Sequence, residues 1–260
     1  MNRFIPGLAV TALICISQAA ATELPLPRDG WASWQVPASE RAPAFCCWNS
    51  WDVSAGATRA CDLDENRGGF GTRDNARTDA IRVYARFTKG SLDRLRTLAA
   101  DCPVESRTPV QDLQGIRTDD SVRWLMSLAD REDLDHEVPA SLAVHQGAHA
   151  LQSLRSLARS GALAETRQHA LFWLAQRGSA DSESIIVAAL RNDPDDGVRE
   201  HALFALSMLP DDRASRALIA AAENRSLSRE QRKRALFWLA QSEAPMAQEY
   251  LDGVLLGAQR

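Results

Sequence analysis

An apolar segment, residues 170–176 (Ala-Leu-Phe-Trp-Leu-Ala-Gln), recurs twice further along the chain. Residues 202–207 and 235–241 are the second and third copies, at offsets of 32 and 33 residues. The first, second and fifth positions of each copy are apolar, and an arginine precedes each copy by three residues. On an α-helix these apolar positions form a single stripe. The pattern therefore predicts three equivalent helices with the same buried face.

A second apolar stripe follows each copy at matching offsets, which predicts a second helix in every repeat. We place these second helices at roughly 180–191, 211–223 and 244–256. Their aligned residues, all expected to be buried, are Ile186, Leu218 and Leu251 in one set and Leu190, Ala222 and Leu255 in the other. One helix pair cannot bury its own apolar face. The repetition therefore predicts an α-solenoid of stacked pairs.

These features together resemble HEAT repeats of the short type, over about residues 139–257. The resemblance rests on the Ala-x-x-x-Leu core, the aspartate-rich turn at 192–196 and the shared Arg167, Arg199 and Arg232. More narrowly, the chain is similar to exported bacterial HEAT-repeat proteins with a small N-terminal region that contains cysteine and tryptophan. Segments like 172–176 and 204–210 recur in that group. The resemblance implies the fold and no particular chemistry.

Residues 1–21 have the pattern of a cleaved signal peptide. Arg3 gives a basic start, residues 4–16 are mostly apolar, and three alanines at 19–21 offer a cleavage site. The apolar run is too short for a stable membrane span. Cys15 follows the large Ile14, which argues against lipoprotein processing. We therefore expect a periplasmic or secreted protein that is not inserted in the membrane after cleavage.

Four cysteines remain after the signal segment: Cys46, Cys47, Cys61 and Cys102. An even number in an exported chain predicts two disulfides. A bond between the adjacent residues 46 and 47 would strain the bridge geometry. Two connectivities stay open, 46–61 with 47–102 or 46–102 with 47–61.

The region that contains these cysteines, residues 22–118, is predicted to be a small disulfide-bonded α+β unit. Residues 81–87 alternate apolar and polar side chains, as a half-buried strand does. Residues 91–100 carry leucines three apart, which favours a helix. The tryptophans of the region are Trp31, Trp34, Trp48 and Trp51. We expect them to pack against cystine, and an exposed aromatic patch for a sugar or peptidoglycan fragment is the alternative.

The rest of the chain, residues 119–260, is assigned to the solenoid, so that the fold class is mainly α. Thr118, Asp119 and Asp120 are predicted to cap its first helix. Residues 139–160 are predicted to form a degenerate first repeat.

Charge narrows the classes of partner. The formal net charge is −4, and it becomes −5 when Arg3 leaves with the signal segment. Nucleic-acid binding needs clustered lysine and arginine, so this balance argues against it. It also argues against binding to anionic membrane surfaces.

Two short patterns are candidate metal sites. His145 and His149 have the i, i+4 spacing that can hold zinc on a helix, but Gly147 falls at the expected repeat turn. Residues 62–68, Asp-x-Asp-x-Asn-x-Gly, resemble part of a calcium loop, but Arg67 stands where the turn glycine belongs. We expect no metal at either pattern. The sequence shows no catalytic constellation and no cofactor motif, so we expect a protein that is not an enzyme.

The function predicted from these patterns is a non-enzymatic exported scaffold that binds a protein partner along its solenoid. The second helices of a HEAT array are expected to line its concave side. The charged residues that they are expected to show outward are Glu183, Arg213, Arg216, Glu249 and Asp252. Recognition of an envelope ligand by the tryptophan-rich region is one alternative, and an enzyme with an unrecognised site is another.

Overall fold

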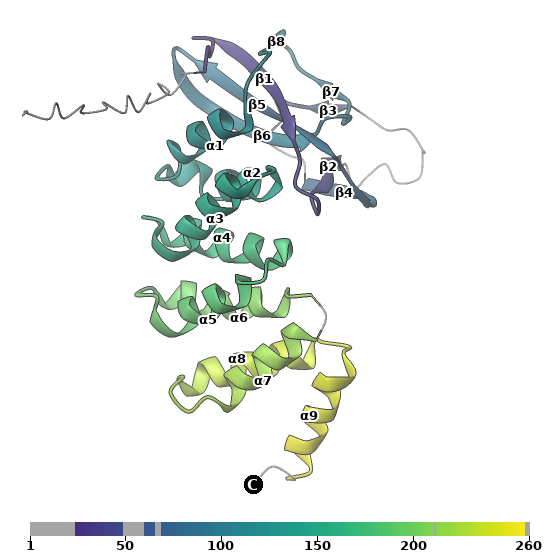
Figure 1. Ribbon diagram of the computed structural model, residues 1–260, viewed down its shortest axis with the longest axis vertical. Coiled ribbons are helices and arrows are strands. Elements are labelled where there is room, and N and C mark those ends of the chain that lie inside the picture. The colour runs from purple at the N-terminus through teal and green to yellow at the C-terminus, as the bar shows by residue number, and fades with distance from the viewer. Residues whose placement is uncertain (1–23, 49–59, 66–68, 211, 258–260) are drawn as a thin grey trace, which may run out of the picture.

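A four-stranded sheet, in the order β6-β5-β1-β8, forms the N-terminal end of the molecule (Figure 1). The computed structural model describes residues 24–48, 60–65, 69–210 and 212–257, so the predicted signal peptide and Trp51 lie outside the described residues. The strands are β1 (Gly30–Pro37), β5 (Ala80–Thr88), β6 (Ser91–Ala99) and β8 (Val110–Asp112). β5 pairs antiparallel with β1 and β6, and β8 pairs parallel with β1.

Successive side chains of a strand point to opposite faces of the sheet, and each face of this sheet packs into its own core. Trp34 and Val83 lie on the face that packs against helices, within the main core of the protein. Trp31, Tyr84 and Leu98 lie on the opposite face and form a second core with the cysteines. The predicted strand at 81–87 is confirmed as part of β5.

The predicted helix at 91–100 is wrong, because these residues form strand β6. Leu92 pairs with Phe87 and Arg94 with Arg86, so Asp93 is an extra residue in a β-bulge. The bulge puts Leu92 and Leu95 on the same face, which imitates a helical spacing. The turn Lys89-Gly90 was the better signal, since both residues have positive φ, 54° and 83°, as a two-residue hairpin turn requires.

Two small sheets lie beside the large one. β2 (Pro43–Trp48) pairs with β4 (Gly69–Arg77), and β3 (Cys61–Asp62) pairs with β7 (Val104–Glu105). The elements described between residues 24 and 117 are therefore all strands, and the expected α+β mixture is corrected to a β region.

A disulfide joins Cys46 in β2 to Cys102, with the Cα atoms 5.5 Å apart. This bond excludes the connectivity 46–61 with 47–102. Cys61 is also disulfide-bonded. The side chain of Cys47 is outside the described part of the structure, so its bond to Cys61 stays a prediction.

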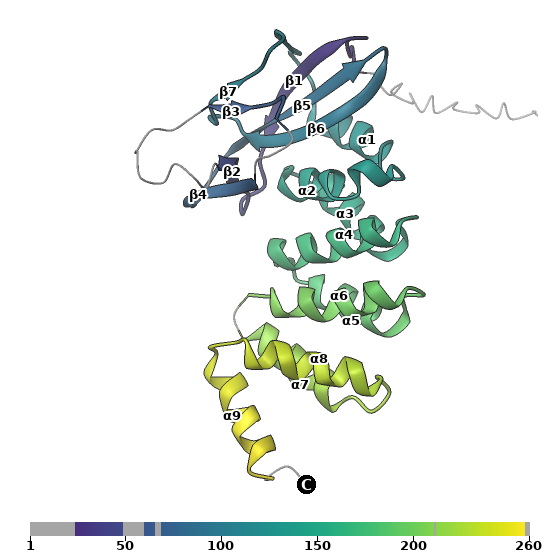
Figure 2. The ribbon, with the colours of Figure 1, turned by 180° about the vertical axis from the view of Figure 1, so that it is seen from behind.

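The remaining described residues form nine α-helices and one short 3₁₀ helix. The α-helices are α1 (Thr118–Met126), α2 (Glu137–Val144), α3 (Ala148–Ser160), α4 (Ala164–Arg177), α5 (Ser182–Asn192), α6 (Asp196–Ser207), α7 (Arg213–Glu223), α8 (Arg229–Ala240) and α9 (Pro245–Leu255). The pairs α2/α3, α4/α5, α6/α7 and α8/α9 follow one another away from the sheet (Figures 1 and 2). The first helices, α2, α4, α6 and α8, pack on one another in that order, and we call them the first-helix row.

The three copies of the repeated segment occupy equivalent positions in α4, α6 and α8. The arginine that precedes each copy makes the same kind of contact in all three. Arg167 Nη1 donates a hydrogen bond to Gly161 O at 2.9 Å, in the turn before its own helix. Arg199 and Arg232 donate in the same way to the carbonyl oxygens of Asp193 and Leu227. This shared arginine therefore fastens each first helix to the turn that leads into it.

The helix ends follow the sequence signals in the later repeats and not in α1. Asp195 caps α6, since its carboxylate accepts from the Val198 N–H at 3.0 Å. Ser228 and Gln231 form a capping box on α8. The predicted cap of α1 at 118–120 is wrong, because the helix already begins at Thr118 and its preceding residue makes no side-chain cap.

The sheet and the first helices share one hydrophobic core and a buried chain of hydrogen bonds. Trp34 Nε1 donates to Ser121 Oγ at 2.8 Å, and Ser121 Oγ lies 2.9 Å from His145 Nε2. His145 Nδ1 lies 2.6 Å from Ser141 O. A carbonyl only accepts, so Nδ1 carries the proton and Nε2 accepts from the serine hydroxyl. The core therefore crosses the proposed boundary at residues 118 and 119.

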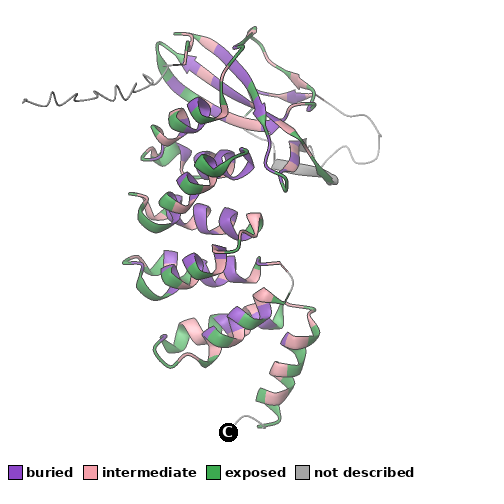
Figure 3. Ribbon diagram, viewed as in Figure 1, coloured by how far each residue is buried: buried purple, intermediate pink, exposed green. Residues whose placement is uncertain are grey.

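The far end of the stack is open. Leu255, predicted to be buried, is 83% exposed, because no helix among the described residues packs over it. Figure 3 shows the same contrast, with buried residues concentrated next to the sheet and few in α9. Ile186, Leu190 and Leu218 are buried as predicted, whereas Ala222 and Leu251 are half-buried.

Candidate functional site

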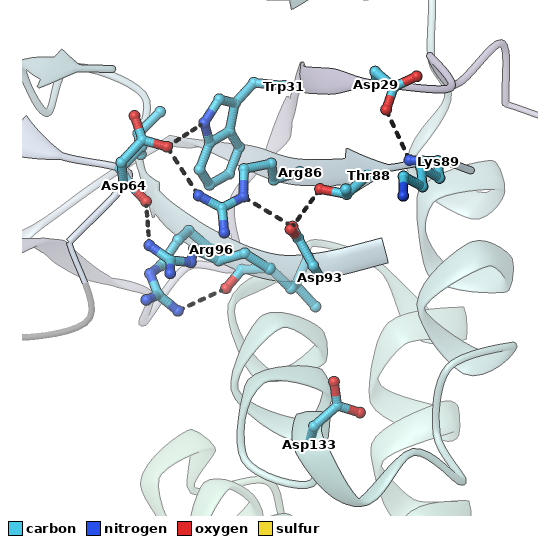
Figure 4. A network of polar contacts seen from close by, with 12 residues as sticks. Asp29, Trp31, Asp64, Arg86, Thr88, Lys89, Asp93, Arg96 and Asp133 are labelled. Carbon is cyan, nitrogen blue, oxygen red and sulfur yellow. Dashed lines mark hydrogen bonds and ion pairs between the residues drawn. The ribbon is translucent and has the colours of Figure 1, made fainter. Parts of the chain in front are cut away.

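A polar network covers the sheet face that points away from the helices (Figure 4). Asp64 Oδ1 accepts from Trp31 Nε1 at 3.1 Å and from Arg86 Nη1 at 3.0 Å. Its Oδ2 accepts from the Arg107 N–H at 2.7 Å. Burial alone would raise the pKa of Asp64, but these hydrogen bonds and the charge of Arg86 hold it below its usual value. The carboxylate of Asp64, a residue of the calcium-like pattern, thus binds the loop that contains it to strands β1 and β5 and to the backbone of Arg107.

The two histidines of the candidate zinc pattern are separated, as the position of Gly147 indicated. Gly147 has a φ of 103° between α2 and α3. His145 is fully buried with both ring nitrogens in hydrogen bonds, and burial lowers its pKa to about 4. His149 is exposed and its Nδ1 lies 3.3 Å from Asp119. Among the described residues, no three histidine, cysteine, aspartate or glutamate side chains are grouped as metal ligands are.

Two of the four tryptophans cannot contribute to an exposed aromatic patch, because Trp31 is 1% and Trp34 is 0% exposed. Trp31 packs in the core that contains Cys46 and Cys61, as expected for tryptophan against cystine. The side chains of the other two tryptophans, 48 and 51, lie outside the described residues.

The charged residues expected on the second helices lie at the surface or close to it, and two of them bind each other. Arg213 Nε lies 3.3 Å from Glu183 Oε2, which ties α7 to α5. Arg216 is exposed and lies 3.9 Å from Asp212. Glu249 and Asp252 are exposed on α9. The Glu183–Arg213 pair already has a structural role between two repeats.

A surface that the sequence reasoning did not single out runs along the first-helix row. Phe172 and Phe204 stack with their ring centres 5.9 Å apart, and Phe204 lies 5.1 Å from Trp238. Phe237 contacts Trp238 and is 46% exposed. The signal was present, since all three phenylalanines occupy the third position of the repeated segment. Aromatic side chains that stay accessible at one repeat position are typical of contact surfaces.

A column of histidines accompanies these aromatic residues. His136 and His169 lie edge to face with ring centres 4.9 Å apart, and His201 contacts Phe204. Burial first, and the neighbouring His169 second, lower the pKa of His136 and of His201. Burial therefore favours the neutral form of His136 and of His201. Charged residues flank the aromatic side chains on α6 and α8, where Arg234 pairs with Glu200 and lies over the ring of Phe237.

One known family resembles the helical repeats. Residues 151–240 match the family model of HEAT repeats. The match begins in α3 and ends at the last residue of α8, so the similarity to HEAT repeats lies within the helical part of the chain. No curated protein is similar enough to the chain to be named as its relative. Within the described ranges, none of the helices has the length and apolar character needed to cross a membrane.

Proposed function

We propose that this protein is an exported, non-enzymatic scaffold whose helix pairs form an α-solenoid that binds a protein partner. HEAT repeats commonly serve as protein-interaction scaffolds, and the match to that family over residues 151–240 carries the proposal. Export rests on the signal-peptide pattern of residues 1–21 and on the disulfide, which persists in oxidising compartments.

The exposed aromatic residues of the first-helix row support a contact surface there. Phe237 and Met208 belong to the small set of large hydrophobic side chains described as exposed. Tyrosine, tryptophan, phenylalanine and methionine are enriched at protein interfaces, while isolated charges contribute little. We therefore favour the first-helix row over the charged second-helix face as the main contact surface.

The test compares three forms of the purified full chain as bait in an envelope extract. One variant replaces Phe237 and Met208 with serine. A second reverses the charges of Arg213, Arg216, Glu183 and Glu249. Phe237, Met208, Arg216 and Glu249 are exposed, so each substitution there should change the free energy of unfolding by about 0.5 kcal/mol or less. Reversing both members of the Glu183–Arg213 pair keeps opposite charges together and should cost no more than about 1 kcal/mol, so the melting curves should stay close to that of the parent.

The proposal expects one saturable protein partner, retained by the parent and reduced severalfold by the aromatic variant. A partner that binds the parent and both variants equally would place the contact elsewhere. Turnover of a substrate by the purified chain would contradict the non-enzymatic assignment.

A further inference from the structure

A pocket of about 380 Å³ lies where the strands β2 and β4 meet the C-terminal ends of α2 and α4. Phe45, Phe172 and Trp173 form its aromatic wall. Phe45 and Trp173 lie edge to face with ring centres 5.7 Å apart, and Phe172 lies 5.0 Å from Trp173 in the same manner. This volume and this apolar lining are typical of sites that bind small groups.

Three arginines line the pocket, and none of its described lining residues is acidic. Arg177 Nη1 donates to the carbonyl oxygens of Ala143 and His145 at 3.0 and 3.1 Å. Arg77 donates to the carbonyl of Arg41. These bonds satisfy donors but bring no negative charge. Burial first, and the charge of Arg155 second, lower the pKa of Arg177, which indicates a cation without a nearby carboxylate.

Arg41 is the most available of these cations. Its side chain is exposed, and it has no hydrogen bond or ion pair to any described residue. Its Nη1 lies at the left-handed C-cap Gly178 of α4, 3.0 Å from the place where a Cβ would stand. The chain as a whole has a net charge of −4, whereas the three guanidinium groups make this pocket locally positive.

Trp173 adds an independent observation. It is only 9% exposed, and its indole Nε1 is buried without a hydrogen-bond partner. Nearly all buried polar groups in folded proteins have a partner, so this unpaired N–H is an unusual group in a residue that lines the pocket, and its resonance can report on what enters there.

We propose that this pocket binds a ligand that carries a carboxylate next to an aromatic or branched apolar group. The guanidinium groups of Arg41 and Arg77 take the carboxylate, for which arginine provides paired donors. Phe45 and Phe172 take the apolar group. This chemistry occurs at the C-terminal residue of a peptide and in a free aromatic acid. For a peptide, the inference rests on the proposed function, since the pocket would hold the end of the protein partner.

The experiment follows the indole N–H resonance of Trp173 by nuclear magnetic resonance in the full chain. The resonance is identified as the one that disappears in the variant Trp173→Phe. The probes are 3-phenylpropanoate for the free acid and acetyl-Ala-Ala-Phe with a free C-terminus for the peptide. The amide of each probe is the uncharged control. We expect saturable shifts with both acids at millimolar concentration and binding at least about tenfold weaker with the amides.

The matched variants separate the pocket from general charge. Arg41→Gln with Arg77→Gln should weaken binding of the acids about tenfold. Arg191→Gln with Arg225→Gln removes two exposed arginines outside the pocket and should leave binding unchanged. Tighter binding of the peptide than of 3-phenylpropanoate assigns the site to a protein end, and the reverse order assigns it to a small acid.

Equal binding of acids and amides, full binding by the Arg41/Arg77 variant, or no shift with any probe would each overturn the pocket proposal. The probes involve no partner protein, so a failure here leaves capture of a partner by the first-helix row intact. If no partner is captured, shifts of the Trp173 resonance with the acids would still support the pocket proposal.

Discussion

The sheet and the helical stack bury their apolar residues in different ways. The sheet is covered on both faces, by helices on the Trp34 side and by a disulfide core on the Trp31 side. The stack buries each helix pair against the next, and within the described residues no element covers Leu255 in the last pair. The two ends of the repeat array therefore differ, one closed by the sheet and the other open.

The largest effect is expected where the sheet joins the stack. Trp34→Ala removes a fully buried side chain and the hydrogen bond to Ser121, so it should lower the free energy of unfolding by about 3–5 kcal/mol. Leu255→Ala at the open end should change it by about 0.5 kcal/mol or less. Denaturant unfolding of both variants measures the difference. Similar costs at the two sites would contradict the contrast between closed and open ends.

The disulfide core should matter for the sheet more than for the stack. Cys46→Ser with Cys102→Ser opens a bridge between residues 56 apart and should cost about 2–4 kcal/mol. The chain contains no cysteine after Cys102, so the helical circular dichroism of the stack should persist when the sheet loosens. If the helical signal falls in the same step as the sheet's near-ultraviolet signal, the stack depends on the bridge as well.

Acid should destabilise the contact between the sheet and the first helices, because His145 is buried there. Its folded pKa is about 4 against an ordinary 6.5, so the unfolded chain takes up a proton first as pH falls. Above pH 6.5 the ring is neutral in both the folded and the unfolded chain, so the free energy of unfolding does not depend on its titration there. Between pH 6.5 and 4 only the unfolded chain gains the proton, and the free energy of unfolding should fall by on the order of 3 kcal/mol. His145→Gln lacks this titration, so its stability should fall less steeply over that window. Equal slopes for parent and variant would exclude His145 as the cause.

Smaller effects should rank the ion pairs within the stack. Arg167 and Asp193 form two hydrogen bonds of 2.9 Å and are mostly buried, so Asp193→Asn should cost about 1–3 kcal/mol. The Glu183–Arg213 pair is more exposed, and Glu183→Gln should cost between about 0 and 1 kcal/mol. Thermal unfolding of the two variants compares them, and a reversed order would show that the buried pair does not hold the repeats together.

Much of the stack could be predicted because one helix pair is written several times in the sequence. Arg167 and its equivalents recur with the copies, and each makes the same contact. The sheet was harder, because a bulge at Asp93 gives Leu92 and Leu95 a helical spacing. The pocket could not be predicted at all, since Arg41, Arg77 and Arg177 meet only through the folding of distant segments.

Photo-crosslinking from defined positions in living cells tests the central claim most directly. A photoreactive phenylalanine analogue would replace Phe237 on the first-helix row, Arg216 on a second helix, or Gln111 in β8 of the sheet, all of them exposed. The account predicts that Phe237 yields a crosslink to a single protein, that Arg216 yields less of it, and that Gln111 yields none. Strong crosslinking from Gln111 with none from Phe237 would contradict binding by the helical stack.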